Sequence, residues 1–209
     1  MSIMEIQKVR YSYDNKRKVL NGISTALDEG KMYAILGQSG CGKTTLLSLL
    51  GGLDSPLDGQ ILYDGQDIEK IGLANHRKKN VAFIFQSYNL IDYLTPKENV
   101  ALTAKLSPQP ILERVGLTEE ESKRNVLKLS GGQQQRVAIA RALASDAKVI
   151  LADEPTGNLD EDTAAEIISI LKECAHQMKK CVVIVTHSNE LAKQADTVFC
   201  LKKGRLQQL

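Results

Sequence analysis

The chain has 209 residues, of which 43% are hydrophobic and 25% charged, and its formal net charge is +2. Such a balance excludes a nucleic-acid binder driven by bulk charge, which would need a strong basic excess. No apolar run approaches the roughly 20 residues that span a bilayer, and no secretory signal is visible at the N-terminus. The four cysteines form no C-x-x-C pair, which argues against a zinc site and fits the reducing cytoplasm. Two basic clusters, Lys16-Arg17-Lys18 and Arg77-Lys78-Lys79, are predicted to be solvated loops.

Two hydrophobic patterns divide the predicted strands. Residues 3–36 and 60–68 alternate more between apolar and polar side chains and carry turn signals, which predicts a small antiparallel β section. Continuous apolar runs are instead typical of strands buried on both faces of a parallel sheet. Four such runs occur, at 32–36, 81–85, 149–152 and 182–185.

Helical patterns lie between several of these runs. One core-facing stripe at helical spacing consists of Ile167, Ile168, Leu171, Cys174, Ala175 and Met178. The alternation of buried strands and amphipathic helices predicts the α/β fold class, with a mainly parallel central sheet.

Residues 89–129 are predicted to be a helical insertion. Thr95-Pro96-Lys97-Glu98 combines an N-cap Thr, a Pro at the first helical position and a capping-box Glu. Thr118 to Glu121 repeats the capping-box spacing. Ser107-Pro108-Gln109-Pro110 is expected to break the insertion in two.

The first apolar run leads into a phosphate-binding loop. Gly37-Gln38-Ser39-Gly40-Cys41-Gly42-Lys43-Thr44 matches G-x-x-x-x-G-K-[ST], and Thr45 follows. Its glycines let successive N–H groups point at phosphate oxygens, and the helix predicted from Lys43 directs its positive end at them. Lys43 is expected to contact the β- and γ-phosphates, and the Thr44 hydroxyl to bind Mg²⁺. The alternative is a glycine-rich turn without a ligand, which a strand before and a helix after make less favourable.

The other three apolar runs also deliver polar side chains at their carboxyl ends. These are Gln86, Asp153-Glu154 and Thr186-His187. In open parallel sheets ligands bind outside the carboxyl ends of the strands, so these side chains are predicted to gather beside the loop. Asp153 is expected to hold Mg²⁺ through water, and Glu154 to polarise a water that attacks the γ-phosphate. A charged strand end at the surface, or a structural His, is the alternative for each residue taken singly.

A second predicted helix N-terminus follows at Leu129-Ser130-Gly131-Gly132-Gln133, with Ser130 as the N-cap. One phosphate-binding loop does not need a second anion site in the same subunit, and the alternative is a well-capped helix. Here the sequence resembles the ATP-binding cassette (ABC) family, whose signature is LSGGQ. The P-loop, the Q-loop Gln86, the D-loop Asn158-Leu159-Asp160 and the switch His187 stand in the family's order. The resemblance covers essentially the whole chain.

This resemblance implies an ABC ATPase, a P-loop NTPase with a central sheet, a small antiparallel β section and a helical subdomain. It implies a single nucleotide-binding domain over 1–209, with an ATP-binding core at 1–88 and 130–209 and a helical subdomain at 89–129. The implied cofactors are ATP and Mg²⁺. The implied partners are a second copy of the chain in the ATP-bound state and a transmembrane permease, with no nucleic acid.

Individual roles follow from the same resemblance. Glu154 would be the catalytic base, and His187 would hold the γ-phosphate and the attacking water. Gln86 would sense Mg²⁺, which Thr44 and Asp153 also bind, and would couple to the membrane partner. Tyr13 would stack on adenine, with Tyr11 as second choice and plain strand packing as the alternative for either. The residues implied to bind the partner subunit's ATP are Ser130, Gly131, Gly132, Gln133 and Asp160.

Four segments, 51–54, 85–90, 94–100 and 152–160, resemble the macrolide-efflux, lipoprotein-release and antimicrobial-peptide-efflux group. The leading interpretation is the ATPase subunit of an exporter or resistance system, bound through its permease to the inner face of the plasma membrane. The alternative is a nontransport ATPase that regulates a membrane protein in cell division or signalling. Residues 103–112 look compressed around two prolines, which puts the geometry of the permease-docking arm in question. The chain end soon after His187 argues against importers with a C-terminal regulatory domain.

Overall fold

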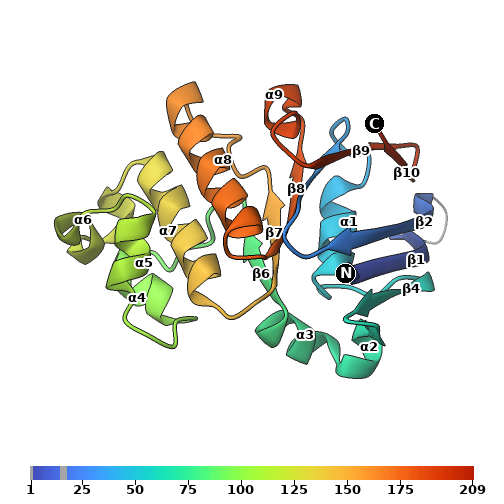
Figure 1. The fold of residues 1–209 in the computed structure, drawn as a ribbon, viewed down its shortest axis with the longest axis horizontal. Coiled ribbons are helices and arrows are strands. Elements are labelled where there is room, and N and C mark those ends of the chain that lie inside the picture. The colour runs from blue at the N-terminus through green and yellow to red at the C-terminus, as the bar shows by residue number, and fades with distance from the viewer. Residues whose placement is uncertain (1, 15–17) are drawn as a thin grey trace.

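The computed structural model describes residues 2–14 and 18–209. Lys16 and Arg17 of the first basic cluster lie outside the described residues. The described chain contains a six-stranded sheet in the order β10-β9-β3-β8-β7-β6 and a four-stranded sheet in the order β2-β1-β4-β5. Figure 1 shows β1, β2 and β4 at one side of the molecule, α4, α5 and α6 at the other, and the larger sheet between them.

The larger sheet confirms the four predicted buried strands as parallel neighbours, since β3 pairs with β8, β8 with β7 and β7 with β6. Two strands were missed: β9 joins β3 in parallel, and β10 pairs with β9 antiparallel at the edge. The strands are β3 (Met32–Leu36), β6 (Val81–Ile84), β7 (Val149–Asp153), β8 (Cys181–Thr186), β9 (Thr197–Lys202) and β10 (Arg205–Gln208).

The smaller sheet is antiparallel, as the alternating pattern predicts. Its predicted range 3–36 was wrong at one end, because Met32–Leu36 belongs to the parallel sheet. A turn at Asp28-Glu29-Gly30 separates the two, and Gly30 adopts a positive φ of 76° there. The strands are β1 (Ser2–Ser12), β2 (Lys18–Asp28), β4 (Asp58–Tyr63) and β5 (Gln66–Asp67).

Helices cover both faces of the parallel sheet. Val183 and Val185 of β8 pack in the cluster that contains the apolar side of α1 and the smaller sheet. Val182 and Ile184 pack in the cluster that contains α7 and α8, as the alternation of side chains along a strand requires. The helices are α1 (Lys43–Leu50), α2 (Ile68–Ile71), α3 (Leu73–Lys79), α7 (Gly131–Ala144), α8 (Glu161–His176) and α9 (Asn189–Ala192).

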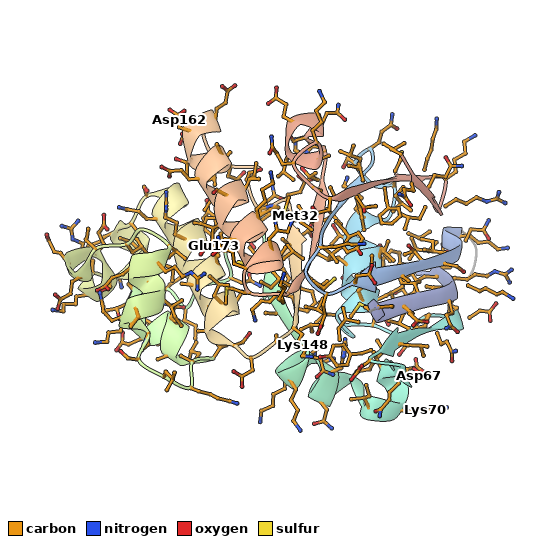
Figure 2. All side chains as sticks on the ribbon, in the orientation of Figure 1. Met32, Asp67, Lys70, Lys148, Asp162 and Glu173 are labelled. Atoms are coloured by element: carbon orange, nitrogen blue, oxygen red, sulfur yellow. The ribbon has the colours of Figure 1, made fainter. Side chains whose placement is uncertain are left out.

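Short helices follow β6 in the predicted insertion, and both predicted capping boxes are present at Thr95 and Thr118. Their apolar side chains, such as Val100 and Leu112, share one cluster with α7, α8 and the sheet. An ion pair also joins Arg114 of α5 to Glu173 of α8, which is labelled in Figure 2. The elements are α4 (Pro96–Ala101), α5 (Gln109–Arg114), α6 (Glu119–Lys123) and the 3₁₀ turn η1 (Val126–Lys128).

Two further findings concern the surface. Arg77-Lys78-Lys79 is exposed as predicted, but it forms the last turn of α3 and is not a loop. Within residues 2–14 and 18–209, no helix has both the length and the apolar composition needed to cross a bilayer.

A matched pair of leucine substitutions tests the packing of α8. Leu171 is fully buried between α8 and the sheet, so Leu171→Ala is expected to lower the free energy of unfolding by about 2–5 kcal/mol through the cavity it leaves. Leu106 is 83% exposed, so Leu106→Ala should change it by less than about 0.5 kcal/mol. Urea unfolding of both variants measures the difference. Similar losses would contradict the packing described here.

A candidate nucleotide site at the ends of the parallel strands

The loop between β3 and α1 has a backbone that requires glycine. A Cβ on Gly37 would lie 2.5 Å from Cys41 Sγ and 2.8 Å from the Leu201 carbonyl oxygen, so no larger residue fits. Gly40 and Gly42 have φ angles of 74° and 106°, in the region that side chains disfavour. The chain can therefore turn tightly from strand to helix with its N–H groups free of side-chain cover.

Lys43 begins α1 and is almost fully buried. Its Nζ donates to the carbonyl oxygens of Gly37, at 2.7 Å, and Gln38, at 3.3 Å. It also lies 4.0 Å from Glu154 Oε1. The loop thus encloses a positive charge that its own carbonyls orient, which suits a ligand with several anionic oxygens.

Thr44 and Asp153 face each other across the end of β7. Burial raises the pKa of the Asp153 carboxyl, while a hydrogen bond with the Thr44 side chain and the charge of Lys43 oppose that rise. No group of three His, Cys, Asp or Glu side chains occurs among the described residues at metal-binding distance. A hydroxyl and one carboxylate fit Mg²⁺, which takes few protein ligands and completes its shell with phosphate oxygens and water.

Glu154 directly follows β7 and has a φ of 46°, unusual for a residue with a side chain. Its Oε2 lies 3.0 Å from His187 Nδ1 and accepts from the His187 backbone N–H at 3.3 Å. The Glu154 side chain is 14% exposed and that of His187 is 71% exposed. The strained backbone therefore holds the carboxylate inward, between a cationic amine and an imidazole.

The four strand ends meet around one cavity of about 930 Å³, as predicted from their positions in a parallel sheet. Loop and strand-end residues line it together: Ser39, Gly40, Gly42, Lys43, Thr44, Thr45, Gln86, Asp153, Glu154 and His187. Asp14 and Val19 also line it, and the sequence analysis missed both because neither belongs to a motif.

The two candidate adenine partners differ in position. Tyr13 is 72% exposed, lines the cavity, and has its hydroxyl oxygen 2.8 Å from Thr45 Oγ1. Tyr11 is buried and donates its hydroxyl to Asp54. Tyr11 therefore packs inside the protein, and the second choice for a stacking partner was wrong.

The LSGGQ segment does not line this cavity. Ser130 caps α7 as predicted, accepting from the Gln133 N–H, while Gln133 Oε1 accepts from the Ser130 N–H at 2.9 Å. Ser130 is exposed. Asp160 caps α8 in the same manner, because its carboxylate accepts from the backbone and the hydroxyl of Thr163. The N-terminus of α7, at the LSGGQ segment, and the N-terminus of α8, at Asp160, therefore both lie outside the cavity at the start of α1.

Arg141 is a residue that the sequence analysis missed. It lies on α7 and donates to the carbonyl oxygens of Tyr88, at 3.0 Å, and Asn89, at 2.6 Å. Both acceptors have positive φ, 62° and 49°. The Tyr88 hydroxyl lies 3.0 Å from where a Cβ of Gly131 would stand. Helix α7 therefore contacts the loop after Gln86 both at its first turn and near its end. That loop contains no glycine, so nothing in the sequence indicated its positive φ angles.

Comparison with known proteins places this geometry in a family. The profile described as ABC transporter matches residues 20–157. The chain is 46% identical, over 98% of its length and 95% of the relative, to the uncharacterized ABC transporter ATP-binding protein YclH of Bacillus subtilis. It is 40% identical to the macrolide export ATP-binding/permease protein MacB of Escherichia coli K12, over 98% of this chain and 34% of that protein.

The solved ABC transporter cassette MJ0796 has the same fold. Its dimeric structure superposes with a TM-score of 0.87 at 34% identity, over 99% of this chain and 98% of that one. Another dimeric structure of MJ0796, in a post-hydrolysis state with ADP and Pi, gives 0.86 at 33% identity over the same shares. The chain therefore belongs to the ABC transporter family and is an ATP-binding, ATP-hydrolysing cassette.

Proposed function

We propose that this cassette is the ATPase subunit of an exporter or efflux system and drives a separate permease at the inner face of the plasma membrane. The convergence of the phosphate loop, Asp153, Glu154, His187 and Gln86 on one cavity carries the ATPase part. The export part rests on MacB, a macrolide export ATP-binding/permease protein of which this chain spans about a third. A permease partner accounts for the part of such a protein that this chain does not match.

In this proposal the phosphate loop binds the phosphates, with residues 37–45 around them and Lys43 on the β- and γ-phosphates. Thr44, Asp153 and Gln86 would hold Mg²⁺, which would neutralise charge on the phosphate oxygens. The hydrogen bond between the Thr44 side chain and Asp153 supports this site, because it brings two oxygen donors together beside the phosphate loop.

Hydrolysis then uses Glu154 and His187. A water oxygen bonds to the γ-phosphorus while Glu154 accepts its proton, and the bond from that phosphorus to the bridging oxygen breaks to release ADP. His187 would hold the γ-phosphate and the attacking water. Its contact of 3.0 Å with Glu154 supports this pairing, because the imidazole lies beside the proposed base. Tyr13 stacks on the adenine from the rim of the cavity.

Ser130, Gly131, Gly132, Gln133 and Asp160 are proposed to act on the ATP bound by a second copy. Their separation from the cavity within one chain supports this role, as do the dimeric structures of MJ0796. The exposed Ser130 cap and the backbone N–H groups of the first turn of α7 can approach a phosphate. Gly131 and Gly132 leave room there for the Tyr88 hydroxyl and the Thr163 methyl group, which lie 3.0 Å and 2.7 Å from where their Cβ atoms would stand. Each dimer would close on two ATP molecules.

We propose that the chain divides into an ATP-binding core, 1–88 and 130–209, and a helical subdomain, 89–129. A groove is lined by residues of both parts. This groove, of about 800 Å³, is lined by residues of α3, of β6, of the segment that follows α4, and of the end of α7. Its lining includes Phe83 and Phe85, whose rings stack with centroids 5.2 Å apart. Five Lys or Arg side chains and a single Asp line it, which favours an acidic permease segment with an apolar anchor.

A nontransport ATPase that regulates a membrane protein is the alternative function. Both functions use the same cassette, so the partner decides between them. Co-purification with the membrane protein encoded by a neighbouring gene, followed by a transport assay in vesicles, tests the proposal. A partner that stimulates ATP hydrolysis and moves no substrate would favour the alternative.

Loss of the catalytic base is expected to trap the dimer. Glu154→Gln keeps the shape of the side chain but cannot accept a proton, so ATP should bind and hydrolysis should fall by at least about a hundredfold. Size-exclusion chromatography with Mg-ATP should then show a persistent dimer. The unsubstituted chain provides the control, since it should return to monomer as ATP is consumed. A strictly monomeric variant at high concentration would contradict the proposed sandwich.

Lys43→Ala and Ser130→Ala are expected to fail in different ways. Lys43 acts on nucleotide in its own subunit, so its loss should weaken monomer affinity for ATP by about tenfold or more. Ser130 acts across the dimer, so its loss should leave monomer affinity within about twofold and lower turnover instead. Fluorescent-nucleotide titration and an ATPase assay separate the two effects. Equal loss of monomer affinity would show that the assignment of Ser130 to the partner's ATP is wrong.

Charge reversal tests the proposed docking groove. Lys78→Glu with Lys79→Glu should reduce co-purification with the co-expressed permease by about fivefold or more, because the acidic segment would meet like charge. ATP affinity of the isolated chain should not change. The matched control is Lys202→Glu with Lys203→Glu, an exposed pair on the β9–β10 turn. Equal retention of the permease by both double variants would place the contact elsewhere.

A further inference from the structure

Two tyrosines stand together at the end of β1, one inside the protein and one at the cavity. Tyr11 is buried and Tyr13 is 72% exposed. Their ring centroids lie 5.1 Å apart with an angle of 87° between the ring planes, an edge-to-face contact. The buried ring therefore supports the exposed one from the side.

The buried tyrosine is itself fixed. Its hydroxyl donates to Asp54 Oδ2, and Asp54 Oδ1 accepts from the Ser55 N–H at 2.8 Å. The hydrogen bond to Asp54, with a further contribution from burial, raises the pKa of Tyr11 to about 12. Like any tyrosine, Tyr11 is protonated at neutral pH, so its hydroxyl can donate to Asp54. Asp54 is exposed, so this anchor lies at the surface while the ring lies inside.

The exposed tyrosine is fixed at a second point. The Tyr13 hydroxyl lies 2.8 Å from Thr45 Oγ1, in the first turn of α1. Asp54 follows the end of the same helix, which closes at Gly51. The end of β1 is thus attached near both ends of the helix that begins at Lys43. This arrangement sets the Tyr13 ring in a fixed relation to the phosphate loop.

We propose that Tyr11 and Asp54 are positioning residues that hold the Tyr13 ring where the base of the nucleotide stacks. The inference rests on the proposed stacking of Tyr13. A ring held in place before binding loses less conformational freedom when the base arrives, so the pair raises affinity for the base-bearing nucleotide. Neither residue lines the cavity, so affinity for a phosphate chain without a base should not depend on them.

Titration calorimetry with ADP and with pyrophosphate, each with Mg²⁺, tests this role. Asp54→Ala and Tyr11→Phe should each weaken ADP binding by about threefold or more and leave pyrophosphate within about twofold, while Tyr13→Ala should weaken ADP by about tenfold. Asp54→Asn should keep ADP affinity within about twofold of that of the unsubstituted chain, because the amide oxygen can still accept a hydrogen bond from the Tyr11 hydroxyl. The matched control, Asp58→Ala, removes an exposed carboxylate of β4 that pairs with Arg10 of β1, the strand that contains Tyr11, and should change neither affinity.

Three results would overturn the inference, and each points to a different error. If Tyr13→Ala weakens ADP but Asp54→Ala and Tyr11→Phe do not, the stacking is correct and the positioning role is wrong. If Tyr13→Ala leaves ADP affinity unchanged, both the stacking and the positioning fail. Equal weakening of ADP and pyrophosphate by Asp54→Ala would show a general disturbance of the phosphate loop, and would also refute a base-specific role.

Discussion

The parallel strands are buried on both faces, and this burial fixes their register. Alternate residues of β7 and β8 belong to two different clusters, one with α1 and one with α7 and α8. A slip by one residue would move every side chain of a strand from one cluster to the other, where the neighbouring side chains differ in shape, so close packing favours one register. In that register Leu36 pairs with Thr186, and Asp153 with Val185. The residues that follow those ends meet at one cavity because the core aligns the strands beneath them.

The cavity contains features that stability alone would not favour. Lys43 carries its charge into an almost buried position, where carbonyl oxygens and a distant carboxylate are its partners. Glu154 adopts a left-handed backbone that costs of the order of 1–3 kcal/mol. The hydrophobic clusters on both faces of the sheet compensate for these costs. Strain and charge are concentrated where the bond to the γ-phosphate would be broken.

The short helices of residues 89–129 pack together with α7, the helix that follows the LSGGQ segment. Helix α7 shares its apolar cluster with α4, α5 and the sheet, and Arg141 ties it to the strained loop after Gln86. The Tyr88 hydroxyl stands against Gly131 at the first turn of the same helix. The loop that ends β6 and the exposed Ser130 cap are therefore parts of one packed unit.

The sequence by itself determined the phosphate loop, the four buried parallel strands, the capping boxes and the family, because each depends on local spacing or on a continuous apolar run. It missed β9 and β10, whose residues are less uniformly apolar and become strands by pairing beside β3. It also left Tyr11 and Tyr13 as rival stacking partners, since two tyrosines two residues apart look alike in a sequence. Only the tertiary structure decided that Tyr11 is buried, with its hydroxyl bonded to Asp54, and that Tyr13 lies at the cavity beside Thr45. Asp54 and Thr45 are distant from β1 in the sequence and come close to it when α1 packs beside that strand.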